Sequence, residues 1–249
     1  MRCAVVYKNS AILDKVVKFL KENNVEVEVF STPSRLLEEF DFIVSIGGDG
    51  TILSILQEIK RCPPIFGINI GKIGLLTHAT PFNFEEQLRE AIQKFEVEKF
   101  PRLSCSFEGG EFLALNEVVF FGEERAKLSE IVVRIDSIEV DRIRCDGMIV
   151  ATQIGSTGYA FSAGGPVVDP YLESIVLVPI APFRFGWKPF VLDGNRVVEL
   201  ESSAGFVVID GKRTLGAKKV IVRKSNFPAI FFARKDRFKN LFYTIRRIE

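Results

Sequence analysis

The chain has 249 residues, of which 47% are hydrophobic and 26% charged, and its formal net charge is +1. This length accommodates one large domain or two ordinary ones, and the near-zero charge excludes a strong field that would steer nucleic acid or a membrane surface. The four cysteines are widely scattered without a CxxC pair, and His78 is the single histidine. This pattern argues against structural zinc and against a disulfide framework. We expect all four cysteines to be small core residues.

The first hundred residues alternate between strand and helix patterns. Apolar runs predict strands at residues 3–7, 25–30, 42–46 and 65–70. Apolar residues at helical spacing predict helices at residues 11–23, 34–39, 52–60 and 84–94. This alternation predicts an α/β domain over residues 1–100, with a parallel, Rossmann-like sheet whose ligands bind at the carboxyl ends of the strands.

The pattern changes after residue 100, where strand signals follow one another with turns between them. The predicted strands cover residues 103–107, 112–121, 129–135, 138–144, 147–152, 175–179, 190–192, 196–200, 206–210 and 219–223. They predict a mainly antiparallel, sandwich-like β domain over residues 101–234. The tail is helical again, and we expect residues 235–249 to pack back on the first domain.

The segment Gly47-Gly48-Asp49-Gly50-Thr51 stands between a predicted strand and a predicted helix. Glycines let the backbone approach an anion, and the helix N-terminus offers unpaired N–H groups, so the segment suits a phosphate. An aspartate repels phosphate unless it holds Mg²⁺ or accepts a proton from an attacking hydroxyl, which favours phosphoryl transfer. Spacing alone leaves a plain tight turn as the alternative, and the Gly-Lys-Ser/Thr ending of a Walker A loop is missing.

Three further segments carry polar groups. Residues 155–166 combine glycines, hydroxyls and Tyr159, which suits phosphate or ribose but also a tightly packed turn. Asn116-Glu117 and Asp146-Gly147 interrupt apolar strands, where they could accept hydrogen bonds from ribose hydroxyls or simply mark strand ends.

Taken together and in this order, these segments resemble the NAD kinase family, and the resemblance covers nearly the whole chain. The Gly-Gly-Asp-Gly-Thr segment is shared with diacylglycerol-type lipid kinases and, more loosely, with 6-phosphofructokinases. Residues 155–166 are much more specific to NAD kinases, and residues 69–77 also look like a segment of that family. The family contains dimers and tetramers, so a homo-oligomer is implied.

The resemblance implies transfer of the terminal phosphate of ATP or polyphosphate to the 2′-hydroxyl of the adenosine ribose of NAD or NADH. Asp49 corresponds to the family's proton acceptor, and Gly47, Gly48, Gly50 and Thr51 to its phosphate loop. Mg²⁺ or another divalent metal would bind together with the phosphate donor near Asp49. Protein side chains alone would not form a metal site.

The resemblance also implies dinucleotide contacts along the second domain, with Asp146 supplied across a subunit interface. They fall at Asn116, Glu117, Lys127, Arg144, Asp146, Ile154, Thr157, Gly158, Tyr159, Ala160, Phe161 and Ser162. Weaker matches fall at Ser54, Leu75, Asp210 and Lys212. The chain departs from the family where Ser54 replaces a frequent basic residue and where Lys212 replaces a frequent glutamine.

Two other functions compete with an NAD kinase. A lipid kinase would share the glycine-rich segment, but residues 155–166 and the lack of a basic amphipathic face argue against it. A dinucleotide sensor that has lost catalysis would not need Asp49. We expect a cytoplasmic enzyme with no secretory signal, no membrane association and no nucleic-acid partner. We expect His78 to be a structural residue of a loop or the surface rather than a catalytic one.

Overall fold

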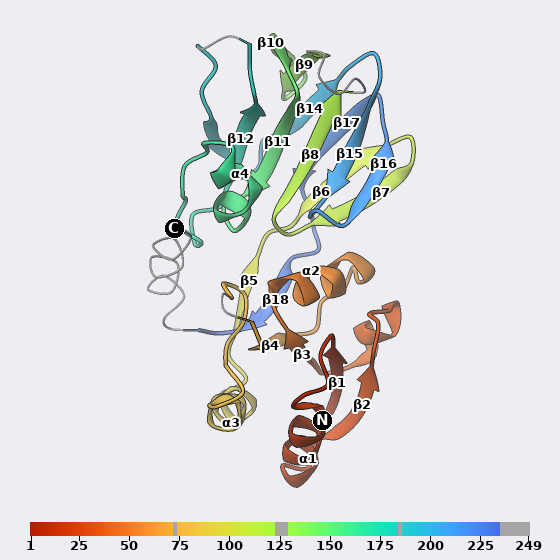
Figure 1. Ribbon diagram of the computed structural model, residues 1–249, viewed down its shortest axis with the longest axis vertical. Helices are drawn as coiled ribbons and strands as arrows, with labels where there is room; N and C mark the ends of the chain where they lie inside the picture. The colour runs from red at the N-terminus through yellow and green to blue at the C-terminus, as the bar shows by residue number, and fades with distance from the viewer. Residues whose placement is uncertain (72–73, 123–128, 184–185, 235–249) are drawn as a thin grey trace. The chain divides into compact units, whose positions relative to one another are not determined.

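The computed structural model describes residues 1–71, 74–122, 129–183 and 186–234, which form two compact units (Figure 1). The first unit comprises Met1–Lys99 and residues 227–234, and the second comprises Phe100–Asn226. The sequence predicts a second domain that extends to residue 234, whereas residues 227–234 belong to the first unit. The predicted tail helix at 235–249 lies outside the described residues.

The first unit is built on a six-stranded sheet in the order β2-β1-β3-β4-β18-β5. Its strands are β1 (Arg2–Tyr7), β2 (Glu26–Phe30), β3 (Phe42–Gly47), β4 (Ile65–Asn69), β5 (Val97–Phe100) and β18 (Ala229–Phe232). Parallel pairing joins β2, β1, β3, β4 and β18. The predicted parallel sheet is therefore confirmed, and β18 joins it from the far end of the chain.

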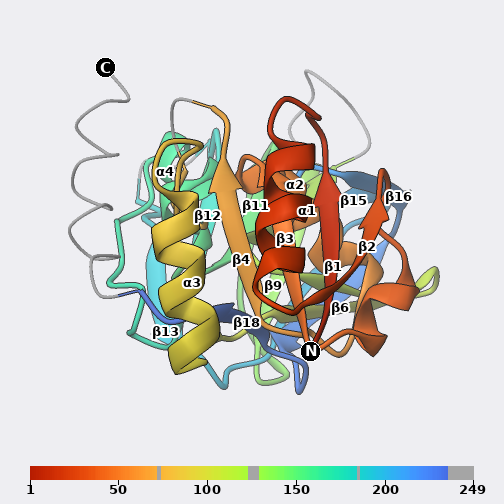
Figure 2. The same cartoon turned by 90° about the horizontal axis from the view of Figure 1, so that it is seen from below.

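Helices cover both faces of this sheet. α1 (Leu13–Glu22) and α3 (Phe84–Lys94) lie on one face and α2 (Asp49–Glu58) on the other, while a 3-10 helix, η1 (Arg35–Glu39), precedes β3 (Figure 2). Val16, Phe19 and Leu20 of α1 and Leu88 of α3 pack on the sheet in one apolar core. Among residues that the structure describes, no helix has the length and apolar character needed to cross a membrane.

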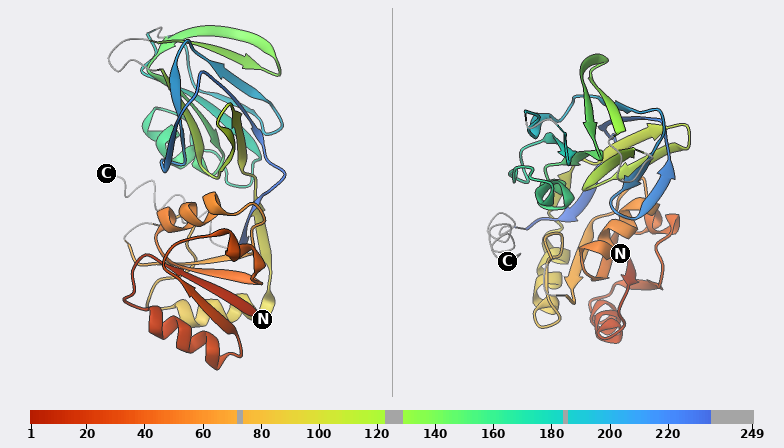
Figure 3. Two further views of the ribbon diagram at one scale, coloured as in Figure 1. Left: turned by 90° about the vertical axis from the view of Figure 1, so that its right-hand side faces the viewer. Right: turned by 45° about the horizontal axis from the view of Figure 1, so that its top comes forward.

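The second unit contains two six-stranded antiparallel sheets, ordered β10-β9-β14-β17-β6-β7 and β13-β12-β11-β8-β15-β16. Their strands are β6 (Leu103–Phe107), β7 (Gly110–Ala114), β8 (Glu117–Gly122), β9 (Ser129–Ile135), β10 (Ile138–Cys145), β11 (Gly147–Thr152), β12 (Ser174–Ile180), β13 (Phe190–Asp193), β14 (Val198–Glu201), β15 (Gly205–Ile209), β16 (Arg213–Gly216) and β17 (Lys219–Lys224). Side chains from both sheets share one core, and the strands form two layers (Figure 3). The predicted sandwich-like antiparallel fold is confirmed.

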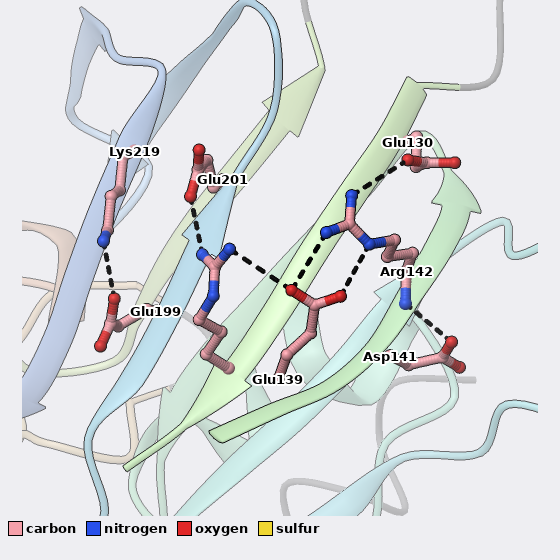
Figure 4. A network of polar contacts seen from close by, with 8 residues as sticks. Glu130, Glu139, Asp141, Arg142, Glu199, Glu201 and Lys219 are labelled. Carbon is pink, nitrogen blue, oxygen red and sulfur yellow. Dashed lines mark hydrogen bonds and ion pairs between the residues drawn. The ribbon is translucent and has the colours of Figure 1, made fainter. Parts of the chain in front are cut away.

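Ion pairs cross the first of these sheets on its polar face (Figure 4). Arg134 on β9 contacts Glu201 on β14 at 2.6 Å and Glu139 on β10 at 3.4 Å. Arg142 on β10 contacts the same Glu139 at 2.7 Å and Glu130 at 3.8 Å. Exposed pairs of this kind each stabilise a fold by little, but the shared Glu139 links the two arginines into one network.

Several predicted boundaries shift by one or two residues, β5, β16 and β18 were not predicted, and two predicted elements differ further from the structure. The predicted strand 112–121 is broken into β7 and β8, because the amides of Leu115, Asn116 and Glu117 donate to a side chain instead of a neighbouring strand. The predicted helix 52–60 begins earlier, at Asp49, because a carboxylate in the first turn is favourable at the positive end of the helix dipole. All four cysteines are buried free thiols, as predicted.

Candidate active site

The glycine-rich segment forms the turn from β3 into α2. Gly48 is extended and caps the helix, and the Thr51 amide donates to its carbonyl at 2.9 Å. A side chain on Gly47 would overlap the Thr51 hydroxyl, so the turn requires glycine there. The Thr51 hydroxyl is buried and has no hydrogen-bond partner among the described residues. The turn therefore presents the positive N-terminal end of α2 to an anion, next to a buried hydroxyl that has no partner among the described residues.

Asp49 lies in the first turn of α2, and backbone amides fix its carboxylate. Its Oδ2 accepts from the Leu75 N–H at 2.8 Å and its Oδ1 from the Leu76 N–H at 3.0 Å. Ser54, one turn further on, donates its hydroxyl to the Gly50 carbonyl at 2.9 Å. The residues that follow β4 thus orient a half-buried carboxylate at the start of α2.

In the second unit, the carboxylate of Asp210 organises the Asn116-Glu117 pair. It accepts from the amides of Leu115 at 2.9 Å, Asn116 at 2.8 Å and Glu117 at 3.0 Å. Asp210 is buried and adopts the left-handed conformation, with φ of 46°, at the end of β15. This one carboxylate therefore supplies the hydrogen-bond acceptor that each of the three backbone N–H groups requires.

The carboxyl of Glu117 is the most perturbed acid of this group. Burial, with the nearby charge of Asp210, raises the pKa of Glu117 to about 8. Burial raises the pKa of Asp210 to about 6, although its three amide bonds act in the opposite direction. The larger upward shift at Glu117 favours a neutral Glu117 beside a charged Asp210. The Oε2 of Glu117 is buried without a hydrogen-bond partner among the described residues.

A glycine-rich segment covers the same pair. It consists of a 3-10 helix, η2 (Gly155–Thr157), and one turn of α-helix, α4 (Tyr159–Ser162). The Tyr159 amide lies near the Glu117 carboxyl and acts to lower its pKa, and a side chain on Gly158 would approach the Glu117 Oε2 to 3.1 Å. A side chain on Gly155 would overlap the Asn116 backbone. Close packing at this turn therefore needs glycine at position 155 and leaves little room for a side chain at position 158.

Thr152, at the end of β11, joins these parts. Its hydroxyl donates to the Leu115 carbonyl at 2.6 Å and accepts from the Gly155 amide at 3.1 Å. Its own amide donates to the Asn116 carbonyl at 2.9 Å. Thr152 is thus a structural residue of this site that the sequence analysis did not select.

The other predicted contacts are placed as follows. Within α4 and η2, Tyr159 and Ser162 are exposed, Ala160 is buried, and Ile154, Thr157 and Phe161 are half-buried. Arg144 and Asp146 are exposed at the opposite end of β11 from Thr152, and Lys212 is exposed after β15. Lys127 lies outside the described residues.

Arg144 and Asp146 are thus separated from Asn116 and Glu117 by the length of β11. The Arg144 guanidinium lies 5.4 Å from the centre of the Phe183 ring, and the Phe183 amide donates to the Arg144 carbonyl at 2.9 Å. A cation over an aromatic face is stabilised by the ring's electrostatic field. These residues form a separate group on the second unit.

Both halves of the chain match a known family. Residues 8–95 match the ATP-NAD kinase N-terminal domain and residues 115–232 match the ATP-NAD kinase C-terminal domain. An NAD kinase of Archaeoglobus fulgidus is 57% identical over 249 residues, covering all of both chains. An NAD kinase of Methanothermobacter thermautotrophicus is 36% identical, covering 92% of this chain and 90% of the relative.

Solved structures agree with these matches. The crystal structure of an NAD kinase from Archaeoglobus fulgidus in complex with ATP superposes with a TM-score of 0.94 and covers 99% of each chain. A yeast NADH kinase complexed with NADH has a TM-score of 0.85, covering 100% of this chain and 87% of that one, and at 20% identity it supports the fold alone. The chain belongs to the NAD kinase family and is a phosphotransferase that acts as an NAD kinase.

Proposed function

We propose that the enzyme transfers the terminal phosphate of ATP or polyphosphate to the 2′-hydroxyl of the adenosine ribose of NAD or NADH, and that Asp49 accepts the proton of this hydroxyl. The observation that carries the proposal is the Asp49 carboxylate at the start of α2, with one amide on each oxygen. A general base must keep its geometry while the proton moves, and two backbone donors supply that geometry. The ATP bound to the relative from Archaeoglobus fulgidus supports ATP as the donor.

The phosphate donor would be held at the turn around Asp49. Gly47, Gly48, Gly50 and Thr51 would offer backbone amides and one hydroxyl to its phosphates. The amide donors of such a turn gain strength on an anion because charged acceptors make the stronger hydrogen bonds. Phosphoryl transfer needs positioning and charge neutralisation more than covalent chemistry, which suits a site with a single carboxylate.

A divalent metal fits this site only together with the donor phosphates. Among the described residues, no group of three or more His, Cys, Asp or Glu side chains could hold a metal ion. Mg²⁺ commonly binds through one or two carboxylates plus substrate phosphates, and Asp49 is the carboxylate at this turn. When bound, Mg²⁺ would neutralise charge on the transferred phosphoryl group. We propose Mg²⁺ or another divalent metal on these grounds.

The second unit would hold the dinucleotide. Asn116 and Glu117 would bind it, and a neutral Glu117 can both donate and accept a hydrogen bond. The turn from Thr157 to Ser162 would line the site, with Tyr159 offering an exposed ring. Ile154, Lys127 and Arg144 would add contacts, with lesser parts for Ser54, Leu75, Asp210 and Lys212. Phosphate binding would thus belong to the first domain, predicted as residues 1–100 with the tail 235–249 packed on it. Dinucleotide binding would belong to the second domain, predicted as residues 101–234 and ending at Asn226 in the structure.

The remoteness of Asp146 from Asn116 and Glu117 within one chain favours a homo-oligomer. A residue at the opposite end of β11 can reach a dinucleotide bound at Asn116 most simply from a second copy of the chain. We therefore propose a dimer or tetramer in which Asp146 serves a neighbouring subunit. Sedimentation of the enzyme with NAD measures this directly, and a monomer at assay concentrations would contradict it.

The test of the proposed mechanism is Asp49→Asn. This variant keeps the size of the side chain but removes the proton acceptor, so turnover should fall by about 10² or more while NAD binding survives. NADP formed from NAD, Mg²⁺ and each of ATP, other nucleoside triphosphates and polyphosphate measures turnover, and calorimetry measures NAD affinity. Asp41→Asn, which alters an exposed carboxylate of the first unit, serves as the control.

Two outcomes would contradict the proposal. If Asp49→Asn loses NAD binding together with turnover, Asp49 is a structural or ligand-binding residue and not the proton acceptor. If the parent enzyme makes no NADP with any donor, the assigned reaction itself fails.

A further inference from the structure

The single histidine of the chain joins three segments of the first unit. His78 Nδ1 lies 3.0 Å from the Gly67 amide on β4, and its Nε2 lies 2.9 Å from the Phe232 carbonyl on β18. Its ring stacks on Phe66, with centroids 4.9 Å apart, and lies 6.3 Å from Phe231. Both ring nitrogens and the ring face are therefore engaged with the two neighbouring strands.

The partners fix the protonation of this imidazole. The Gly67 amide can only donate, so Nδ1 must be an acceptor, and the Phe232 carbonyl can only accept, so Nε2 must carry the proton. His78 is thus held as one neutral tautomer. No other residue type offers an acceptor and a donor on one rigid ring at these two positions.

His78 ends the short segment that orients Asp49. Leu75 and Leu76, whose amides bond the Asp49 carboxylate, lie three and two residues before it, respectively. Behind them, the Arg234 guanidinium donates to the Thr77 carbonyl. Backbone bonds from His78 and Ala79 to the Gly67 carbonyl and from Asn69 to the Ala79 carbonyl also tie the end of this segment to β4.

The segment also packs closely on its surroundings. A side chain on Gly67 would come within 2.9 Å of the Thr77 backbone and of Ile52 on α2. Leu76 and Thr77 are buried. A displacement of the His78 ring would therefore also displace the Leu75 and Leu76 amides, because a close-packed segment cannot absorb the shift locally.

We propose that His78 is a positioning residue for catalysis, which anchors the segment of Leu75 and Leu76 to β4 and β18 and so fixes the Asp49 carboxylate. The proposal rests on the proposed role of Asp49 as the proton acceptor. His78 touches neither the carboxylate nor the reacting atoms, and it acts through the backbone that bonds the carboxylate. Its loss should therefore lower kcat more than it weakens substrate binding.

Two substitutions separate the hydrogen bonds from the ring. His78→Phe keeps an aromatic ring between Phe66 and Phe231 but removes both hydrogen bonds. His78→Asn keeps an acceptor close to the Nδ1 position for the Gly67 amide. We expect kcat to fall by about 10- to 100-fold in His78→Phe, since a small misplacement of a catalytic group is costly, while the KM for NAD changes by about twofold or less. We expect His78→Asn to recover part of this loss.

Two spectroscopic measurements are independent of activity. Because the chain has one histidine, its imidazole nitrogens give one unambiguous NMR signal pair, which should report a proton on Nε2 and none on Nδ1. Exchange of the Leu75 and Leu76 amides with solvent should be faster in His78→Phe than in the parent. Phe82→Leu, at a fully exposed position of the same connection, is the control and should leave kcat and both exchange rates unchanged.

Three results would overturn the proposal: a proton on Nδ1 in the parent enzyme, unchanged exchange at Leu75 and Leu76 in His78→Phe, or equal losses of kcat in His78→Phe and His78→Asn. If His78→Phe does not fold, His78→Asn decides alone, with faster exchange and a lower kcat supporting the proposal and parental values overturning it. An active Asp49→Asn would refute the role of Asp49, whereas the exchange measurement would still test whether His78 holds the segment.

Discussion

At the scale of single residues, two buried carboxyls of the second unit lie close together and influence each other's protonation. Asp210 bonds the three amides of Leu115, Asn116 and Glu117, and the side chain of Glu117 lies close enough for the two charges to interact. Two ionised carboxylates in one buried place repel each other, so one of them keeps its proton. The amide bonds decide that Asp210 is the ionised partner, which leaves Glu117 as a neutral acid near pH 7.

This assignment predicts how stability depends on pH. The pKa of Glu117 is raised to about 8 from an ordinary 4.5, so the folded chain binds this proton more tightly than the unfolded chain does. The stabilisation is complete below the unfolded pKa and is lost as the pH rises through 8. We expect Glu117→Gln, which cannot titrate, to reduce the fall in unfolding free energy between about pH 5.5 and about pH 8.5 by on the order of 2–3 kcal/mol.

Urea unfolding at the two pH values measures this difference. Glu108→Gln, at an exposed position of the same unit, is the matched control and should keep the parental slope. An equal fall in Glu117→Gln and in the parent would show that Glu117 is ionised in the folded chain at neutral pH.

The residues of the site could be predicted from the sequence more readily than the hydrogen bonds that hold them. Asp49, Asn116 and Glu117 were selected because motifs carry residue types in a fixed order. Leu75 was only a weak match, and its role in holding Asp49 together with Leu76 was not predicted, because a backbone donor does not depend on residue type. Thr152, which joins Asn116 to residues 155–157, was missed because long-range side-chain bonds cannot be inferred from sequence spacing. Asp210 was a weak match, and nothing in its neighbours along the chain points to three amides more than 90 positions away.

At the scale of elements, the turn formed by η2 and α4 is set by packing rather than by propensity. Its single helical turn is too short to be stable alone. Ala160 and Val168 instead pack on Ile149 and Val176 on the outer face of the second sheet. From the sequence this segment is recognisable only as rich in glycine and hydroxyls, because the apolar surface that orders it comes from β11 and β12.

This dependence makes Gly155 a sensitive position. We expect Gly155→Ala to lower the free energy of unfolding by about 1–3 kcal/mol and to weaken NAD binding, because the added carbon would overlap the Asn116 backbone and force the turn away from it. Gly216→Ala, on β16 with nothing within 4 Å of the added carbon, should change stability by about 0.5 kcal/mol or less. Denaturant unfolding and calorimetry with NAD measure both effects, and parental affinity in Gly155→Ala would refute the argument.

At the scale of the whole molecule, the alternating and then consecutive strand patterns were sufficient to predict two folds of different class. The placement of β18 in the sheet of the first unit could not be predicted. Ala229–Phe232 is a four-residue apolar run, too short to reveal its partners, and the sheet that it joins ends more than 100 positions earlier. Phe232 packs against Phe42, Phe66 and Phe95, with ring centroids 5.3–6.2 Å apart.

We expect Phe232→Ala to destabilise the first unit selectively, by about 3–5 kcal/mol, because it removes a buried ring from the centre of that core. In differential scanning calorimetry the transition of the first unit should move to lower temperature while that of the second unit stays in place. Phe227→Ala, at a half-exposed position just before β18, is the control. A single transition that moves as a whole would show that the two units melt together.

The position of β18 also has a consequence for synthesis on the ribosome. The nascent chain emerges from its N-terminus, so Met1–Lys99 is made first, yet its sheet lacks the strand between β4 and β5 until residues 229–232 have left the exit tunnel. The second unit is continuous from Phe100 to Asn226 and can close its core before that moment. We therefore expect the order of maturation to be the reverse of the order of translation, with the edge of β4 exposed to chaperones in the meantime.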